Sequence, residues 1–343
     1  MSTSSCIDDK KGSYAQSKNP LDLTVKLGPL ELAFPVINAS GTMELLDLAT
    51  VFGEQILQNP PVSAYVPKTI TLESRAGNAA PRILETASGM INAIGLQGEG
   101  LESFVAYKMP RLLYLPCALI LSIGGFSLTE YEKLAIALQE TLEQSLGEKW
   151  IEKVGLELNL SCPNVATYDD SGDGCACPMQ LGTDPHKTEQ VVSAVRKHWP
   201  GLLIAKLTPN VTDIAEVALA AEIAGADAIS AVNTYKGLLL DRKTLKPFLG
   251  NITGGLSGPA IKPLALRAVY DIFARVSIPI IGMGGIASTQ DAMEFMACGA
   301  SVVAVGSAGF SNPMLGREIT IGLAQELTER NLTAKQVVGC AHS

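Results

Sequence analysis

The 343-residue chain lacks the features that mark several large classes of protein. Acidic residues outnumber basic ones by 34 to 26, and no run of lysine or arginine forms a basic patch, so a nucleic-acid partner is not expected. The longest apolar stretch, residues 112–128, is interrupted by Pro116 and two glycines and is too short to span a bilayer. We interpret it as a buried strand, and no membrane partner is predicted.

The chain also lacks a secretory signal and a cysteine framework. Residues 1–20 are polar without the apolar core of a signal peptide, and they predict a disordered tail ahead of a single domain, residues 21–343. Seven scattered cysteines in a chain of this length fit the reducing cytoplasm. Cys175 and Cys177 form a C-x-C, but no second pair with zinc or iron–sulfur spacing accompanies them, so no metal site is predicted.

What the sequence does contain is an alternation of short apolar runs and longer helix-like segments. Residues 23–35 alternate around Gly28-Pro29 and predict a short hairpin. Eight runs that are hydrophobic throughout follow, at 35–40, 64–70, 118–125, 154–161, 202–208, 228–234, 278–285 and 301–308. Helix-like segments lie between them, at 128–146, 187–199, 211–226, 262–276 and 289–300.

Uniformly apolar strands alternating with helices are typical of a parallel sheet that helices cover. Eight such units predict an α/β fold of the (β/α)8 TIM-barrel type with a short N-terminal hairpin. The competing arrangement is an open doubly wound sheet. That sheet predicts G-x-G-x-x-G after the first strand, where this chain has NASGTM at 38–43.

Polar residues cluster at the predicted strand ends, where a barrel of this type carries its reactive groups. Glycine-rich turns end the seventh and eighth strands, at 282–286 and 306–308, and predict a phosphate site because glycine lets backbone N–H groups approach an anion. Lys68 and Lys206 end apolar strands, so we expect two buried cations that require anionic partners. Carboxamides match the edges of a planar, nitrogen-rich heterocycle, and they come from Asn92, Asn159, Asn164 and Asn233.

Cys162 lies in NLSCPNV (159–165), directly after the fourth predicted strand. Pro163 stiffens a loop at the active face, which favours a reactive thiol over a small core residue. The chain has three histidines, none near Cys162 in sequence, which disfavours a Cys–His hydrolase. We interpret four other cysteines as small buried apolar residues without a chemical role: Cys6, Cys117, Cys298 and Cys340.

Two other classes of function fit the barrel. A Schiff-base aldolase or synthase would use Lys206 on a sugar phosphate. A non-enzymatic sensor of a phosphate ligand would use the glycine-rich turns and would need no thiol in the mouth. Flavin colour, borohydride trapping of the lysine and flavin reduction by substrate discriminate among these.

Several stretches together carry a family resemblance: NASGTM (38–43), LELNLSCPN (156–164), AKLTPNVTDI (205–214), GGLSGPAIKP (254–263) and IIGMGGI (280–286). From about residue 21 to the end of the barrel, the chain resembles dihydroorotate dehydrogenase, class 1. GMINAIGL (89–96), GGLSGP and GMGGI look most like the class 1B catalytic subunit, which uses NAD through a partner, whereas class 1A is a homodimer that uses fumarate.

The resemblance implies a cytoplasmic flavoprotein whose barrel binds FMN and oxidises dihydroorotate to orotate in pyrimidine biosynthesis. By the family pattern, Cys162 is the base that removes the C5 proton while the C6 hydride passes to FMN N5. Residues implied to hold orotate are Lys68, Asn92, Gly95, Leu96, Asn159, Asn164, Asn233 and Thr234. Residues implied around FMN are Ser40, Lys68, Thr69, Asn159, Lys206, Val232, Gly258, Gly284, Gly285, Gly306 and Ser307.

For class 1B, the resemblance further implies a homodimer core that assembles into a heterotetramer with a subunit carrying FAD and a 2Fe–2S cluster. The chain departs from the family in two places. Residues 166–185 carry an insertion whose C-x-C has no explanation, and Leu96-Gln97-Gly98-Glu99 replaces a common LQNP. A sister family, the pyrimidine-reducing domain of dihydropyrimidine dehydrogenase, shares NLSCP but usually has His where this chain has Asn164.

Overall fold

The computed structural model describes residues 22–160 and 181–342. The tail predicted for residues 1–20 lies outside the described residues. So do Cys162 and Asn164, together with Cys6 and the C-x-C of the insertion. What the sequence predicts for them therefore stays a prediction.

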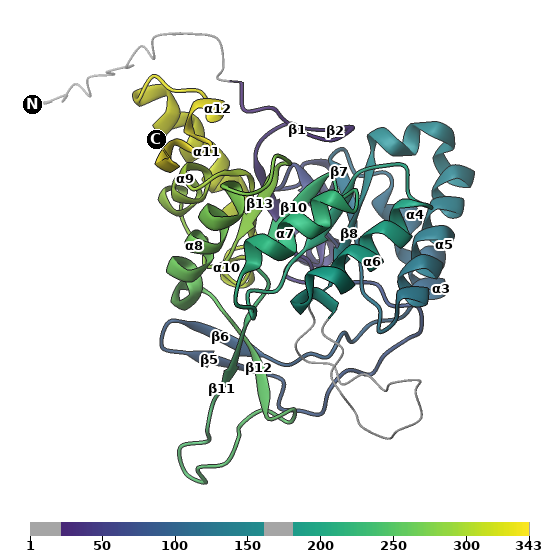
Figure 1. The fold of residues 1–343 in the computed structure, drawn as a ribbon, viewed down its shortest axis with the longest axis vertical. Coiled ribbons are helices and arrows are strands. Elements are labelled where there is room, and N and C mark those ends of the chain that lie inside the picture. The colour runs from purple at the N-terminus through teal and green to yellow at the C-terminus, as the bar shows by residue number, and fades with distance from the viewer. Residues whose placement is uncertain (1–21, 161–180, 343) are drawn as a thin grey trace, which may run out of the picture.

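Eight parallel strands form the centre of the fold (Figure 1). They are β3 (Val36–Asn38), β4 (Ala64–Tyr65), β7 (Ala118–Ile123), β8 (Val154–Asn159), β9 (Leu203–Lys206), β10 (Ala228–Ala231), β13 (Ile280–Met283) and β14 (Ala300–Val305). Their order is β3-β14-β13-β10-β9-β8-β7-β4, and each predicted apolar run overlaps one of them.

The two outer strands of this sheet meet and close it into a barrel. The Asn38 side chain donates to the Val66 carbonyl at 2.7 Å and accepts from the Val66 amide at 2.9 Å. The Ser63 amide donates to the Val36 carbonyl at 3.0 Å. A side chain and a backbone contact thus complete the ring where β4 is short, and the predicted (β/α)8 TIM barrel is confirmed.

Helices surround the barrel. The five long ones are α5 (Leu128–Leu146), α6 (Pro185–Arg196), α7 (Ile214–Ile223), α8 (Lys262–Phe273) and α11 (Leu315–Glu329). The shorter ones are α1 (Leu45–Phe52), α2 (Gln55–Gln58), α3 (Leu101–Ser103), α4 (Met109–Leu112), α9 (Thr289–Ala297), α10 (Ala308–Ser311) and α12 (Ala334–Val337). Five of the helices, α5 to α9, fall on the predicted segments, whereas α11 was not predicted. Polar caps define several starts, since the side chains of Ser127, Asp184 and Asp213 each accept from an amide of the first turn.

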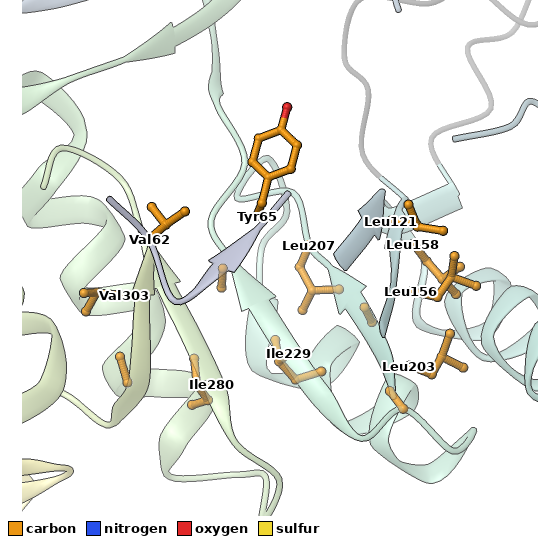
Figure 2. Packing of buried hydrophobic residues seen from close by; sticks show 14 of the residues in the cluster. Val62, Tyr65, Leu121, Leu156, Leu158, Leu203, Leu207, Ile229, Ile280 and Val303 are labelled. Atoms are coloured by element: carbon orange, nitrogen blue, oxygen red, sulfur yellow. The ribbon is translucent and has the colours of Figure 1, made fainter. Parts of the chain in front are cut away.

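Apolar side chains fill two layers, one on each face of the barrel wall. Figure 2 shows Ile229, Ile280 and Val303 in the outer layer, between strands and helices. Neighbouring positions on the same strands, such as Ile281 and Val302, belong to the second cluster and face the interior. Because both faces are buried, the strands show no polar–apolar alternation, which explains why their sequences are hydrophobic throughout.

The predicted hairpin consists of β1 (Val25–Leu27) and β2 (Leu30–Leu32), paired antiparallel around Gly28-Pro29. Gly28 takes a φ of +52°, which suits glycine at a tight turn. Three hairpin leucines, Leu27, Leu30 and Leu32, are fully buried in the same apolar cluster as the interior side chains of the barrel. The hairpin therefore caps one end of the barrel.

A second sheet lies at the opposite end of the barrel from the hairpin (Figure 1). Its antiparallel strands are β5 (Ile83–Thr86), β6 (Gly89–Asn92), β11 (Tyr235–Leu238) and β12 (Thr253–Ser257), in the order β11-β12-β6-β5. This sheet was not predicted, because β12 begins Thr-Gly-Gly and glycine is a poor strand former. A Cβ at Gly254 would lie 2.6 Å from the Asn92 carbonyl oxygen, so close backbone approach requires glycine there.

The remaining predictions on apolar residues are partly confirmed. Residues 118–123 of the long apolar stretch form β7, whose last five residues are buried. Burial raises the pKa of the half-buried Cys117 to about 11, as expected for an apolar environment. Cys340 is exposed, so its interpretation as a buried residue is wrong. Within 22–160 and 181–342, no helix is both long and apolar enough to cross a membrane.

Candidate active site

A cavity of about 390 Å³ opens where the carboxyl ends of the barrel strands meet the antiparallel sheet. Every described residue that the sequence predicted around substrate or cofactor lines it: Ser40, Lys68, Thr69, Asn92, Gly95, Leu96, Asn159, Lys206, Val232, Asn233, Thr234, Gly258, Gly284, Gly285, Gly306 and Ser307. These residues come from seven barrel strand ends and two antiparallel segments. Their individual roles stay predictions, but their convergence on one cavity is an observation.

Apart from Leu96 and Val232, the apolar part of the cavity lining was not predicted from the sequence. Ile83 and Met90 come from β5 and β6, and Phe310 comes from α10, a helix that was not predicted. Ala39, Gly41 and Thr42 also line the cavity and directly flank Ser40, so their position was available from the sequence. An apolar wall facing a few polar groups is typical of small-molecule sites.

Carboxamides on one side of the cavity form a hydrogen-bonded chain. Asn233 Nδ2 donates to Asn159 Oδ1 at 3.1 Å, and Asn159 Nδ2 donates to Thr69 Oγ1 at 3.1 Å. Thr69 Oγ1 in turn lies 3.0 Å from Ser122 Oγ, and the Thr234 amide donates to Asn233 Oδ1 at 2.8 Å. The chain fixes which faces of the amides remain available, so the cavity presents oriented donors and acceptors to a ligand.

The two predicted lysines differ in burial. Lys206 on β9 is 4% exposed, and its Nζ lies 2.8 Å from Ser40 Oγ. Lys68 is only half-buried, so the prediction of two buried cations holds for Lys206 alone. Lys206 Nζ also lies 3.5 Å from Oε1 of Glu157, a carboxylate that the sequence analysis did not single out. Glu157 could have been singled out from the sequence, because it is the one charged residue of the strand 154–159 and lies two residues before Asn159.

Glycines form a cradle on the other side of the cavity. Gly258, Gly284 and Gly285 have φ values of +92°, +130° and +81°, which disfavour other residues. A Cβ at Gly285 would lie 2.7 Å from the Gly258 carbonyl oxygen, so the two turns touch through their backbones. A Cβ at Gly306 would meet only Ala39 Cβ at 4.0 Å, and Gly306 lines the cavity. The cradle thus leaves space that an anion with several oxygens can fill.

An ion-pair network braces the cradle from behind. Lys262, at the start of α8, donates to Asp291 at 2.6 Å and lies 2.8 Å from Glu294 on α9. These hydrogen bonds raise the pKa of Lys262, so it stays a cation bound to carboxylates of the chain. The Asp291 carboxylate also accepts from the Ala287 amide at 2.9 Å. These contacts therefore hold α8 and α9 together, the two helices that follow the glycine turns. None of the side chains involved lines the cavity.

The segment 92–99, where the chain departs from the common LQNP, is tied to residues 75–82. Arg82 donates to Gln97 Oε1 at 2.7 Å, and the Arg75 amide donates to the Gly98 carbonyl at 2.9 Å. Glu99 pairs with Lys108 at 2.9 Å on the side away from the cavity. Gln97, which the common LQNP also has, and Glu99, which departs from it, thus serve local contacts that hold Gly95 and Leu96 at the cavity.

Comparisons with known proteins agree on one family. The family described as dihydroorotate dehydrogenase matches residues 22–327. A protein of Trichlorobacter lovleyi named dihydroorotate dehydrogenase B (NAD(+)), catalytic subunit, is 43% identical over 313 residues, 90% of this chain and 95% of the relative. Proteins with the same name from Pelobacter propionicus and Carboxydothermus hydrogenoformans are each 44% identical, over 91% and 94% of this chain and 95% and 98% of the relatives.

Proposed function

Because the chain belongs to the dihydroorotate dehydrogenase family, we propose that it oxidises (S)-dihydroorotate to orotate in pyrimidine biosynthesis. The resemblance found in the sequence motifs is confirmed, including the closer likeness to the B-type catalytic subunit. The observation that carries the proposal is the convergence of the described predicted residues on one cavity at the barrel mouth. Dihydropyrimidine-reducing and fumarate-using enzymes are the alternatives.

FMN is the proposed cofactor, and the cavity suits its two halves. The glycine cradle fits a phosphate, and the oriented amides with Lys206 fit the edge of a flavin ring. When bound, FMN supplies the two-electron acceptor that the oxidation needs. The neighbouring Ser40 hydroxyl and Thr69 hydroxyl add neutral hydrogen-bonding groups on the same side.

The chain's own residues orient the substrate and take its proton. Asn92, Asn159 and Asn233 offer amides that match the imide edges of dihydroorotate, and Lys68 offers a positive charge for its carboxylate. Cys162 is the proposed base that removes the C5 proton, while the C6 hydride leaves with its electron pair. Loss of one proton and one hydride converts the dihydropyrimidine into orotate, so the reaction balances.

NAD⁺ is the proposed final acceptor, reached through a second subunit. Three of the relatives carry NAD(+) and "catalytic subunit" in their names, which supports this choice over fumarate. The subunit proposed by resemblance carries FAD and a 2Fe–2S cluster and passes two electrons from FMN to NAD⁺. We place the enzyme in the cytoplasm, where NAD⁺ and pyrimidine precursors are available.

Anaerobic mixing with dihydroorotate tests the proposal. The purified protein should be yellow, and its flavin absorbance should bleach within one turnover when dihydroorotate is added. Bleaching by dihydrouracil but not by dihydroorotate would favour the dihydropyrimidine dehydrogenase-like alternative. A colourless protein that borohydride traps on Lys206 with a sugar phosphate would overturn the proposal. Reoxidation of the bleached protein by fumarate alone would show that the electron acceptor is fumarate and not NAD⁺.

A homodimer core is the proposed quaternary unit, and the antiparallel sheet supports it. Its arm, residues 235–257, exposes large apolar side chains, among them Leu245 at 73% and Ile252 at 60%. Such clusters are uncommon on monomers and mark contact surfaces. Light scattering should give twice the chain mass for the wild type and a monomer for L245S/I252S. A double variant that stays dimeric, or a wild type that is monomeric at micromolar concentration, contradicts the proposal.

A further inference from the structure

We propose that Glu157 is a positioning residue that holds the Lys206 ammonium at the cavity and offsets part of its positive charge, which makes the bound flavin harder to reduce. The inference rests on the proposed function, because it concerns the flavin. It concerns a residue on β8 that does not line the cavity itself. According to this proposal, a carboxylate that lies one layer below the cavity controls how readily the bound flavin is reduced.

Glu157 and Lys206 are the only charged side chains among the buried residues of the part of the chain that the structure describes. They are 3% and 4% exposed, and Glu157 Oε1 lies 3.5 Å from Lys206 Nζ. Ser230 Oγ lies 3.2 Å from Glu157 Oε2, and Ser40 Oγ lies 2.8 Å from Lys206 Nζ. The pair therefore has polar partners at both ends and forms a defined unit inside the barrel.

Three adjacent strands place this unit. Asn159 on β8 pairs with Lys206 on β9, and Lys206 pairs with Ser230 on β10. Glu157 lies two residues before Asn159, and alternate residues of a strand share a face, so both point inward. Lys206 consequently lies between Glu157 below and the cavity above, where it lines the wall beside Asn159.

A stability role alone does not explain a buried ion pair. Desolvation of two charges costs about as much as their attraction returns, and apolar replacements of similar volume are often as stable. The lysine stem is flexible, and its charge is a point charge without fixed direction. A carboxylate on one side and a hydroxyl on the other hold the ammonium in one place, which a binding site for a ring edge requires.

The charges of Glu157 and Lys206 also affect how readily the flavin is reduced. Reduction adds electrons to the ring, so a nearby cation favours the reduced flavin and a nearby anion opposes it. Lys206 alone would favour the reduced form strongly, because the interior screens charge weakly. Glu157 adds an anion within 3.5 Å of that cation and so weakens its effect. Removing the anion should therefore shift the flavin toward the reduced form.

The test compares variants of the full-length protein reloaded with FMN. Glu157→Gln and Glu157→Met both remove the charge at similar length, and Glu157→Asp is the matched control that keeps it. The measurement is the dissociation constant of oxidised and of dithionite-reduced FMN, together with the flavin midpoint potential by dye equilibration. For E157Q or E157M, we expect the ratio of the oxidised to the reduced dissociation constant to rise about tenfold or more.

E157D should keep that ratio within about threefold of the wild type and show only weaker binding of both forms. A purely structural role would lower thermal stability in all three variants and leave the ratio unchanged. An unchanged ratio in a folded E157Q or E157M that binds FMN overturns the inference, and so does an equal rise in E157D. A wild-type protein that binds no FMN would instead overturn the proposed function.

Discussion

Cys162→Ser is expected to retain FMN and bind orotate but to lose turnover near pH 7 by about 10²- to 10⁴-fold, the usual contribution of a general base. A thiol ionises near neutral pH when cationic groups and amides surround it, whereas a serine hydroxyl does not. Some activity should return at high pH, because hydroxide can replace the missing base. Stopped-flow measurement of flavin bleaching by dihydroorotate from pH 6 to pH 10 checks this expectation.

Cys117 provides a matched control for this substitution. It is half-buried directly before β7, at the strand end opposite the cavity, and burial raises its pKa to about 11. Cys117→Ser should therefore bleach with the wild-type rate at every pH. Full activity of C162S at pH 7 would refute the base role, and equal losses in both variants would point to a general effect of removing thiols.

Gly306→Val is expected to weaken FMN binding by more than about 100-fold, because a branched side chain would occupy the space that the cradle leaves for a phosphate. The fold should tolerate the change, since a Cβ there meets only Ala39 Cβ at 4.0 Å and the φ of Gly306 is not positive. Flavin content after purification and titration of the apoprotein with FMN measure the effect. Gly306→Ala should give an intermediate affinity.

Gly98→Val is the matched control for the cradle. A Cβ at Gly98 also meets open space, but Gly98 lies outside the cavity, beside Glu99. G98V should bind FMN as tightly as the wild type and unfold at the same temperature. If G306V binds FMN with wild-type affinity, the phosphate does not lie in the cradle between Gly258, Gly285 and Gly306.

The barrel could be predicted from the sequence because its strands are buried on both faces. Residues 154–159 are apolar apart from Glu157 and Asn159, and that uniformity separated a parallel strand from a surface one. The antiparallel sheet could not be predicted, because its residues are chosen by close contact and not by propensity. Gly255 is an example, since a Cβ there would lie 2.0 Å from Thr234 Oγ1.

The site was predictable from topology at the strand ends, whereas away from them only individual motifs predicted lining residues, namely Asn92, Gly95, Leu96 and Gly258. Asn159, Lys206 and Asn233 end strands of one barrel, so topology alone brings them to a common mouth. Ile83 and Phe310 reach the cavity from elements that the sequence did not reveal. Burial of Lys68 was overestimated, because β4 ends at Tyr65 and leaves Lys68 in a following segment that is less enclosed than a strand.

The N-terminal hairpin limits the direction from which ligands can reach the cavity. Leu27, Leu30 and Leu32 close the end of the barrel opposite the cavity, so a ligand reaches the cavity from the side of the antiparallel sheet. In the proposed reaction, orotate therefore leaves on the side by which dihydroorotate entered. Entry from one side favours two alternating half-reactions, in which dihydroorotate reduces the proposed flavin before the proposed electron carrier reoxidises it.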